Sequence, residues 1–292
     1  MALEGLEAGV RRIVAPNPSA LTYRGTCSYV LGEGQVAVLD PGPADRAHLA
    51  ALLAGLAPGE RVAAILVTHA HLDHSPGAAL LAEATGAPVL GFGGPQAGRS
   101  AVMERLAATG LAGGGEGVDA AFAPDICLAH GEGLRLGAAE IVALHTPGHF
   151  GNHLSFRLGD AVFSGDLVMG WSSTLISPPD GDLADYFASL ERLAGQGARV
   201  FYPGHGEPVA DPAARLAELA AHRQARSAQI LAALATGPAT VAALTSALYA
   251  DVNAALHPAA ARNVFAHLVE MASKNIVRAW PELAPDARFE RL

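Results

Sequence analysis

The sequence predicts a layered α/β protein followed by a small helical module, and three observations indicate this. Apolar runs of strand length alternate with alanine-rich helical patterns over about the first two hundred residues, which is typical of sheets covered by helices. From about Pro212 the pattern becomes almost wholly helical. Side chains that bind metals recur just after the strand-like runs. We therefore predict two domains, residues 1–211 and residues 212–292.

The composition limits the class of protein. The chain has 292 residues, of which 51% are hydrophobic and 16% are charged, as expected for a globular protein rather than a disordered one. No apolar run approaches the roughly 18 to 20 residues of a membrane span. The N-terminal MALEGLEAGVRRIV also lacks the apolar core of a signal peptide, so we expect a cytoplasmic protein without a membrane partner. Cys27 and Cys127 fit no metal-binding spacing, and we expect both to be reduced thiols in the core.

Charge is unevenly distributed along the chain. The net charge is −9: residues 1–221 hold 12 basic and 23 acidic residues, a net of −11, whereas residues 222–292 hold 7 and 5, a net of +2. An acidic body disfavours tight binding of a polyanion, because clustered lysine and arginine normally neutralise the phosphates. Bound divalent cations would add positive charge that this count omits.

The elements of the first half follow from the spacing of apolar residues. CSYVLGEGQVAVLD (27–40) predicts a hairpin, and ADRAHLAALLAGLAPGE (44–60) predicts a helix that ends at Pro-Gly. RVAAILVTH (61–69) is apolar on both faces, which predicts a buried strand. SPGAALLAEATGAPVLGF (75–92) predicts a helix and another strand. We expect the glycine-rich segment 91–117 to be mobile.

Four further strands and one helix are predicted before the composition changes. The strands are EIVALH (140–145), HLSFRLG (153–159), DAVFSGD (160–166) and ARVFYPG (198–204), and the helix is LADYFASLERLAGQG (183–197). The tail predicts three helices, at 211–234, 240–252 and 257–275, and then the short strand IVRAW (276–280). Three helices followed by a strand suggest a small winged-helix-like module.

Four metal-binding side chains crowd the stretch THAHLDHSPG, residues 68–77, at the end of the predicted strand 61–69. Side chains alternate in an extended segment, so His69 and His71 can reach one metal ion together. Asp73 and His74 follow a turn and can face a second ion. Imidazole and carboxylate ligands suit zinc, manganese or iron.

Three more candidate ligands follow other predicted strands, namely His149, Asp166 and His205. Loops at strand ends can converge on one point of a rigid sheet, so His149 would complete the first cluster and His205 the second. The two oxygens of Asp166 can bridge the ions. Seven ligands for two ions leave open positions for water, which is typical of a catalytic site. A hydroxide held between ions about 3.5–4 Å apart is a strong nucleophile at neutral pH.

The pattern His69-x-His71-x-Asp73-His74, with His149, Asp166 and His205 downstream in that order, resembles the metallo-β-lactamase superfamily over residues 10–210. The resemblance implies an αββα sandwich with the metals at one edge of its two sheets. It implies that His69, His71 and His149 bind one ion and that Asp73, His74 and His205 bind the other. Asp166 would bridge the two ions.

A narrower resemblance links the chain to the β-lactamase-like protein 2 group. It rests on PNPSALT (16–22), YPGHG (202–206), HRQAR (222–226) and the helical tail. The resemblance implies that the tail is a winged helix. An animal member of that group is an endoribonuclease that acts on single-stranded RNA.

Five other residues have two interpretations each. His153 can contact the substrate or simply open the next strand. Tyr202 can donate a hydrogen bond to an oxyanion or lie in the core. Asp40 ends a strand, where the resemblance implies an acid that orients a metal ligand. Arg223 and Arg226 can reach an anionic substrate from the tail or lie on a solvated helix face.

Three functions follow from these observations. The one we favour is a hydrolase of a small acyl compound (a thioester, lactone, ester or amide). It would use two divalent metal ions, for which we expect zinc, with manganese or iron as the alternatives. In this hydrolase Asp73 would bind a metal ion and would also hold the bridging hydroxide in line for attack on the substrate. The second is an endoribonuclease acting on single-stranded RNA. The third is an iron-dependent oxidoreductase or sulfur dioxygenase on the same fold, although oxygen-reducing relatives usually carry Glu where this chain has His71. The sequence identifies neither the physiological substrate nor the oligomeric state.

Overall fold

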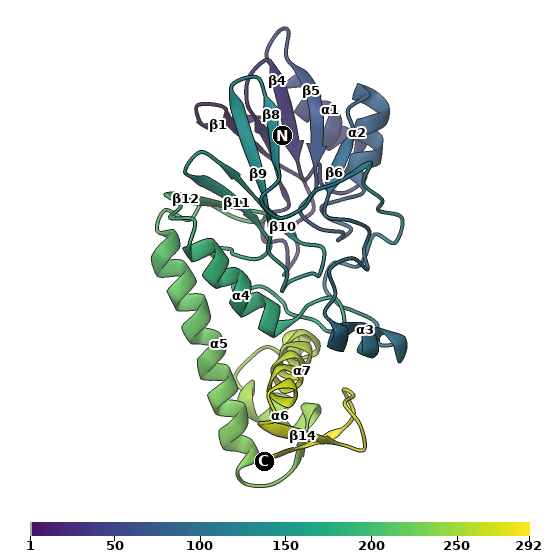
Figure 1. Ribbon diagram of the computed structural model, residues 1–292, viewed down its shortest axis with the longest axis vertical. Coiled ribbons are helices and arrows are strands. Elements are labelled where there is room, and N and C mark those ends of the chain that lie inside the picture. Colours follow the sequence, from purple (N-terminus) through teal and green to yellow (C-terminus); the bar gives the residue numbers. More distant parts are fainter. Residues whose placement is uncertain (1) are drawn as a thin grey trace.

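The structure is a computed structural model that describes residues 2–292. Two β-sheets pack face to face in the first part of the chain, and helices cover their outer faces (Figure 1). The first sheet has the strand order β1-β2-β3-β4-β5-β6-β7, with bounds β1 (Glu4–Glu7), β2 (Val10–Val14), β3 (Cys27–Leu31), β4 (Gln35–Leu39), β5 (Arg61–Leu66), β6 (Val89–Gly91) and β7 (Ile126–Cys127). The second has the order β12-β11-β10-β9-β8, with bounds β8 (Gly133–Leu136), β9 (Ala139–His145), β10 (Leu154–Leu158), β11 (Ala161–Gly165) and β12 (Val200–Pro203).

Seven α-helices and a third, small sheet complete the described chain. The helices are α1 (Arg46–Ala54), α2 (Gly77–Thr85), α3 (Ala101–Ala108), α4 (Leu183–Ala194), α5 (Pro212–Leu234), α6 (Val241–Leu248) and α7 (His257–Ser273), with a 3-10 turn at Ala254–Leu256. The small sheet has the order β13-β15-β14, with bounds β13 (Ala239–Thr240), β14 (Val277–Trp280) and β15 (Arg288–Arg291). None of the helices in residues 2–292 combines the length and apolar character needed to cross a membrane.

Apolar side chains fill three layers of the sandwich, as the alternation of the strands predicts. Tyr29 of the first sheet meets Phe163 of the second between the two sheets. Leu52 of α1 packs on the outer face of the first sheet, and Leu190 of α4 packs on the outer face of the second. The predicted αββα sandwich is therefore confirmed.

The direction of the central strands brings the loops that follow them to one edge. Strands β4 and β5 are parallel, and so are β11 and β12. The carboxyl ends of each parallel pair therefore open at the same end of their sheet. The predicted hairpin at 27–40 is confirmed, because β3 and β4 pair antiparallel across Gly32-Glu33-Gly34.

The C-terminal part has its own apolar core. Ile230 and Leu234 from the end of α5 pack there with residues of α6, α7 and the small sheet. Leu216 and Leu219, earlier in α5, pack instead with α4 on the sandwich. One long helix thus connects both parts, as Figure 1 shows for α5. The predicted division at residues 211 and 212 falls at the start of this helix and stays a prediction.

Several sequence expectations need correction. The glycine-rich segment 91–117 contains α3, whose N-terminus is capped by the side chain of Ser100. Met103 and Leu106 of α3 are buried in the C-terminal core, and this burial explains why a helix forms here. The sequence had predicted a mobile segment because of its glycines. Cys127 lies exposed on the short strand β7, and only Cys27 is buried. The sequence pattern also missed the short strands β1, β2, β7, β8, β13 and β15.

The buried histidine of α7 gives the fold a testable pH dependence. Burial, with Arg223 and Arg226 nearby, lowers the pKa of His267 to about 3. An unfolded histidine has a pKa near 6.5, so between these values the unfolded chain binds one more proton. This contribution to stability is therefore present above pH 6.5 and is lost as the pH falls.

We expect the His267→Gln variant to lose this dependence. From pH 7.5 to pH 5, wild-type protein should lose about 2 kcal/mol of unfolding free energy relative to the variant, which is one proton over roughly 1.5 pH units. Urea unfolding of both proteins across this range measures the difference. Parallel stability curves for the two proteins would show that His267 titrates normally in the folded state.

Candidate metal centre

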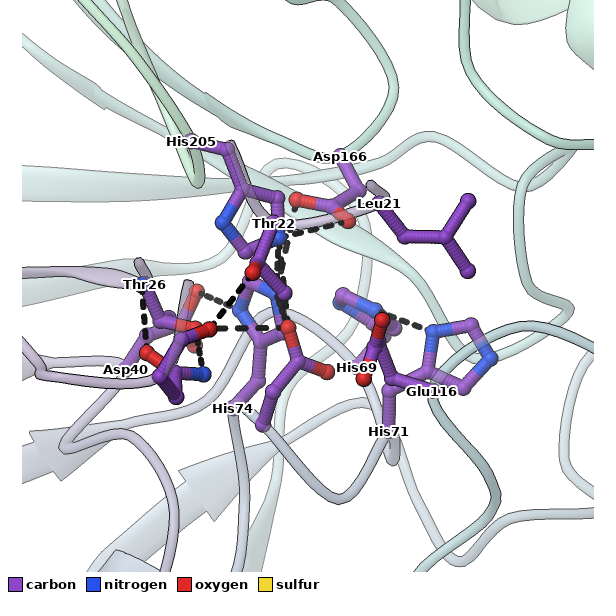
Figure 2. Close-up of polar contacts among 12 residues, drawn as sticks. Leu21, Thr22, Thr26, Asp40, His69, His71, His74, Glu116, Asp166 and His205 are labelled. Carbon is purple, nitrogen blue, oxygen red and sulfur yellow. Dashed lines mark hydrogen bonds and ion pairs between the residues drawn. The ribbon is translucent and has the colours of Figure 1, made fainter. Parts of the chain in front are cut away.

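The seven candidate ligands lie just beyond the carboxyl ends of strands, where the fold brings them together. Figure 2 shows His69, His71, His74, Asp166 and His205. They come from loops after four strands: His69, His71, Asp73 and His74 after β5, His149 after β9, Asp166 after β11 and His205 after β12. Their donor atoms form three overlapping groups, each spanning no more than 4.8 Å: His69, His71 and His149; His69, His74 and Asp166; and Asp73, His74 and His205. All seven side chains are buried.

Three imidazoles meet in the first group. Nδ1 of His71 lies 2.9 Å from Nε2 of His69 and 3.0 Å from Nε2 of His149. His71 is held at this place by a backbone bridge to Val118, directly after the glycine-rich segment, and Gly115 and Glu116 of that segment line the site. The three ring nitrogens therefore face a common point.

Two imidazoles and a carboxylate meet in the group formed by Asp73, His74 and His205, which we call the second group below. Nε2 of His74 and Nε2 of His205 are 3.3 Å apart, and Oδ2 of Asp73 lies 3.3 Å from the first and 3.2 Å from the second. Asp166 lies between the groups. Its Oδ2 is 3.2 Å from Nε2 of His205 and 3.8 Å from Nε2 of His149, so a single carboxylate faces both sides.

Hydrogen bonds from residues behind the site orient the rings of His149 and His205, so that Nε2 of each ring points toward the other candidate ligands. Nδ1 of His149 is 2.9 Å from the carbonyl of Leu175, and Nδ1 of His205 is 3.2 Å from the carbonyl of Gly25. A carbonyl oxygen can only accept, so both Nδ1 atoms donate and the Nε2 atom of each of these two rings faces the site.

Asp40 fixes two other rings from behind. Its carboxylate accepts from the backbone nitrogen and the hydroxyl of Thr68, both at 2.7 Å, and from Nδ1 of His74 at 2.8 Å. The Thr68 hydroxyl has thus used its only hydrogen, so at 2.9 Å it accepts from Nδ1 of His69. Asp40 therefore orients one ligand directly and another through Thr68, which is how buried carboxylates tune metal ligands.

The two groups differ in charge. Burial and the neighbouring His149 lower the pKa of His71 to about 3, and burial also lowers the pKa of His69 and His149. Burial opposes protonation of His205 as well, but Asp166 and Asp73 outweigh it and raise the pKa of His205 to about 10. Near neutral pH the imidazoles of the first group are therefore neutral, whereas His205 in the second group is protonated. A metal ion that binds the second group has to displace this proton.

A glycine is required where the two carboxylate-bearing loops meet. A Cβ atom at Gly204 would lie 2.3 Å from Oδ1 of Asp166 and 2.8 Å from Cε1 of His74. Any larger residue at position 204 would therefore push two ligands apart. This explains the glycine before the histidine in YPGHG.

The donor set fits divalent metal ions. In the first group the lone pairs of His69 and His149 face the same nitrogen of His71, and a single N–H there satisfies only one of them. Oδ1 of Asp73 and Oδ1 of Asp166 are buried without a hydrogen-bond partner. Buried acceptors that face each other are unfavourable unless a cation lies among them. Imidazole and carboxylate are ligands that zinc, manganese and iron accept.

The site opens into a small cavity. The cavity beside the ligands measures about 50 Å³, and its lining includes Leu21, Glu116 and Trp171. Figure 2 shows Leu21 and Glu116 beside the histidines, and the Ser19 hydroxyl donates to Glu116 at 2.8 Å across the two loops. Trp171 stacks on Tyr23 with ring centroids 5.0 Å apart, and both rings are partly exposed. The cavity therefore admits a small reacting group and leaves an aromatic surface outside.

Two suggested substrate contacts do not face this cavity. His153 is fully buried, and its ring bonds the Thr146 hydroxyl and the backbone nitrogen of Asp166, so its neighbours leave no nitrogen for a substrate. The ring of Tyr202 packs between the sheets, and burial together with Glu7 raises the pKa of its hydroxyl to about 12. For both residues the structural interpretation holds, because the sheet directs these side chains away from the cavity.

The sequence did not single out three hydroxyls that support the site. The Thr68 hydroxyl links Asp40 to His69, as described above. Thr26 donates to Oδ2 of Asp73 at 3.3 Å, and the hydroxyl of Thr174 lies 2.8 Å from Nδ1 of His149. Thr68 directly precedes the histidine-rich stretch and was detectable by its position. The other two come from remote loops, and no local pattern marks them.

Comparison with known proteins agrees with the fold and the site. The sequence profile of the metallo-beta-lactamase superfamily matches residues 22–205, and that of the beta-lactamase associated winged helix domain matches residues 240–281. The chain therefore belongs to the metallo-beta-lactamase superfamily and is a hydrolase with a C-terminal winged helix domain.

Individual relatives cover almost the whole chain. The beta-lactamase-like protein 2 homolog of Drosophila melanogaster is 28% identical over 95% of this chain and 92% of its own. The atrochrysone carboxyl ACP thioesterase of Aspergillus fumigatus is 28% identical over 84% of this chain and 74% of its own. The crystal structure of a metallo-beta-lactamase family protein from Thermus thermophilus superposes with a TM-score of 0.77 at 29% identity, over 99% of this chain and 100% of its own.

We predict that Asp40→Asn weakens metal binding at the second group. Asparagine tolerates the positive φ of 47° at this position, but its amide nitrogen would face the donors of Thr68 and His74. Loss of such a supporting carboxylate typically lowers metal affinity about 10- to 100-fold. Titration of metal-free protein with zinc measures the change, with Asp45→Asn, which alters an acid that caps α1, as the control. Equal affinities for wild type and Asp40→Asn would contradict the supporting role.

Proposed function

We propose that the protein is a binuclear metal-dependent hydrolase of a small acyl substrate, with thioesters as the first class to test. The observation that carries this proposal is the set of three overlapping donor groups, with Asp166 shared between the two sides. One ion would bind His69, His71 and His149, and the other would bind Asp73, His74 and His205. Zinc is our first choice for both ions, ahead of manganese or iron.

In this proposal the chain's own residues orient the reaction. Two bound ions would supply a hydroxide at neutral pH and polarise the scissile carbonyl. Asp73 would help to hold one ion, and its Oδ1, which has no hydrogen-bond partner within the described residues, could accept a hydrogen bond from the attacking water. Thr26 holds the other oxygen and so fixes the direction of the carboxylate. The buried walls exclude bulk water, which strengthens these interactions.

Two observations favour a thioester or a similar activated acyl group. The relatives from Aspergillus fumigatus and Emericella nidulans carry the names of thioesterases. The cavity of about 50 Å³ has room for a reacting carbonyl but not for a large molecule. A substrate in which a small acyl group is attached to a bulkier carrier fits such a cavity, with the carrier resting near Trp171 and Tyr23.

The endoribonuclease alternative has less support from the arrangement of charge. Six arginines of the C-terminal part donate hydrogen bonds to protein groups: Arg215, Arg223, Arg226, Arg262, Arg278 and Arg288. Clustered free cations are what a phosphate backbone requires. The RNA substrate, the iron-dependent alternative and a cytoplasmic location all stay predictions.

We expect Asp73→Ala and His71→Ala to abolish turnover while the fold persists. Both variants remove a metal-binding side chain that is not itself a member of the apolar core clusters, so the cooperative unfolding transition should remain. Hydrolysis of a panel of acyl thioesters and lactones by zinc-loaded protein measures activity, with circular dichroism as the check on folding. Substantial turnover by either variant would refute the proposed site.

Single-stranded RNA provides the competing assay. Zinc-loaded wild type and His71→Ala are incubated with an end-labelled single-stranded RNA under the same conditions. Cleavage by wild type alone, with no hydrolysis of any acyl compound, would replace the acyl hydrolase by the nuclease. Hydrolysis of a thioester with intact RNA supports the proposal made here.

A further inference from the structure

The ring of His149, in the first group, is oriented by hydrogen bonds to a loop from elsewhere in the chain. Its Nδ1 lies 2.9 Å from the carbonyl of Leu175 and 2.8 Å from the hydroxyl of Thr174. Both residues belong to segment 172–177, which follows Trp171 and lines the cavity. The position of this ring therefore depends on what holds segment 172–177.

Two helices of the C-terminal part hold that segment. The guanidinium of Arg223, on α5, donates from Nη2 to the carbonyl of Thr174 and from Nη1 to Oδ1 of Asn263 at 3.0 Å. Asn263, on α7, also accepts from the backbone nitrogen of Ile176 at 3.1 Å. A chain of hydrogen bonds thus runs from α5 and α7 through the segment to the ring of His149.

The burial of Arg223 indicates that this contact matters. The side chain is 2% exposed and lies over the ring of Tyr186, 5.6 Å from its centroid. Among residues 2–292, none of the ion pairs includes Arg223, so its charge is balanced only by neutral acceptors. Burying a cation without a carboxylate is unfavourable, and an apolar side chain would fill the same space at less cost. The guanidinium is therefore placed for its directed donors.

A second arginine, Arg262 on α7, supports the opposite wall. Arg262 donates to the carbonyl of Ala112 and to the hydroxyl of Ser177, both at 3.0 Å. It therefore joins segment 172–177 to the glycine-rich segment, in which Gly115 lines the cavity with His71. Both loops beside the first group of ligands thus rest on the C-terminal helices.

We propose that Arg223 is a positioning residue that fixes His149 through Thr174 and Leu175, so that the C-terminal helices set the affinity of the first metal group. The inference rests on the proposed function. It also assigns a role to HRQAR: Arg223 supports the site, whereas Arg226 stacks over Tyr249, 4.1 Å from its centroid, and holds α6. The suggestion that Arg223 reaches an anionic substrate is excluded, because no part of its guanidinium faces the cavity.

The test is a metal titration of wild type, Arg223→Met and Arg223→Lys after removal of metal. We expect wild type to bind two zinc ions. Arg223→Met should bind one ion as tightly as wild type and the other about 10- to 100-fold more weakly, the range typical for loss of a supporting hydrogen bond. Arg223→Lys keeps one donor for the Thr174 carbonyl and should recover part of the affinity.

A matched control separates positioning from general destabilisation. Arg226→Met removes the same charge three residues along the same helix and should leave both affinities unchanged. If Arg223→Met does not fold, Asn263→Ala provides a smaller change in the same chain of hydrogen bonds and should weaken the same ion.

The outcomes distinguish this inference from the proposed function. Two tight ions in both Arg223→Met and wild type would overturn the inference and leave the binuclear hydrolase standing. Equal weakening of both ions, together with a lower unfolding temperature, would also overturn it in favour of a purely structural arginine. Fewer than two ions in wild type would overturn both proposals.

Discussion

Five imidazoles and two carboxylates lie buried at one edge of the sandwich, where their lone pairs face one another. This crowding is the constraint on which the rest of the structure depends, because such groups separate unless hydrogen bonds hold them or a cation lies among them. Asp40, the carbonyls of Leu175 and Gly25, and the hydroxyl of Thr174 hold the rings from behind. The rings of His74, His149 and His205 are thus turned toward the centre before any metal binds, which is the preorganisation that a catalytic site requires.

The two sheets and the C-terminal helices contribute different parts of this arrangement. Parallel pairs in each sheet bring the ligand-bearing loops to one edge. The interior between the sheets keeps that edge rigid, with Tyr29, Phe156 and Phe163 buried in it. The helices α5 and α7 then support the loop that completes the first group. The C-terminal helices therefore support the site as well as forming their own apolar core.

The strongest features were predictable because they are local or periodic. Apolar runs predicted the strands that precede the ligands, and the spacing of His69, His71, Asp73 and His74 predicted their shared destination. The contact of Thr174 with His149 spans 25 residues, and that of Arg223 with Thr174 spans 49, so no short pattern signals them. α3 escaped notice because its two buried residues pack on a core formed by the end of the chain.

The sequence also could not predict the direction in which individual side chains point. His153 and Tyr202 lie close to ligands in the chain, but the pleat of β10 and β12 and the facing sheet decide that one ring supports Asp166 and the other fills the interior. Short strands such as β7 and β8 depend on neighbours for pairing and carry weak periodicity of their own.

The most direct test of the account is anomalous diffraction at the zinc absorption edge from crystals of zinc-loaded protein. Two peaks about 3.5–4 Å apart should appear, one beside His69, His71 and His149 and one beside Asp73, His74 and His205. Asp166 should lie between them. A single peak, or peaks that do not share Asp166, would contradict the binuclear centre.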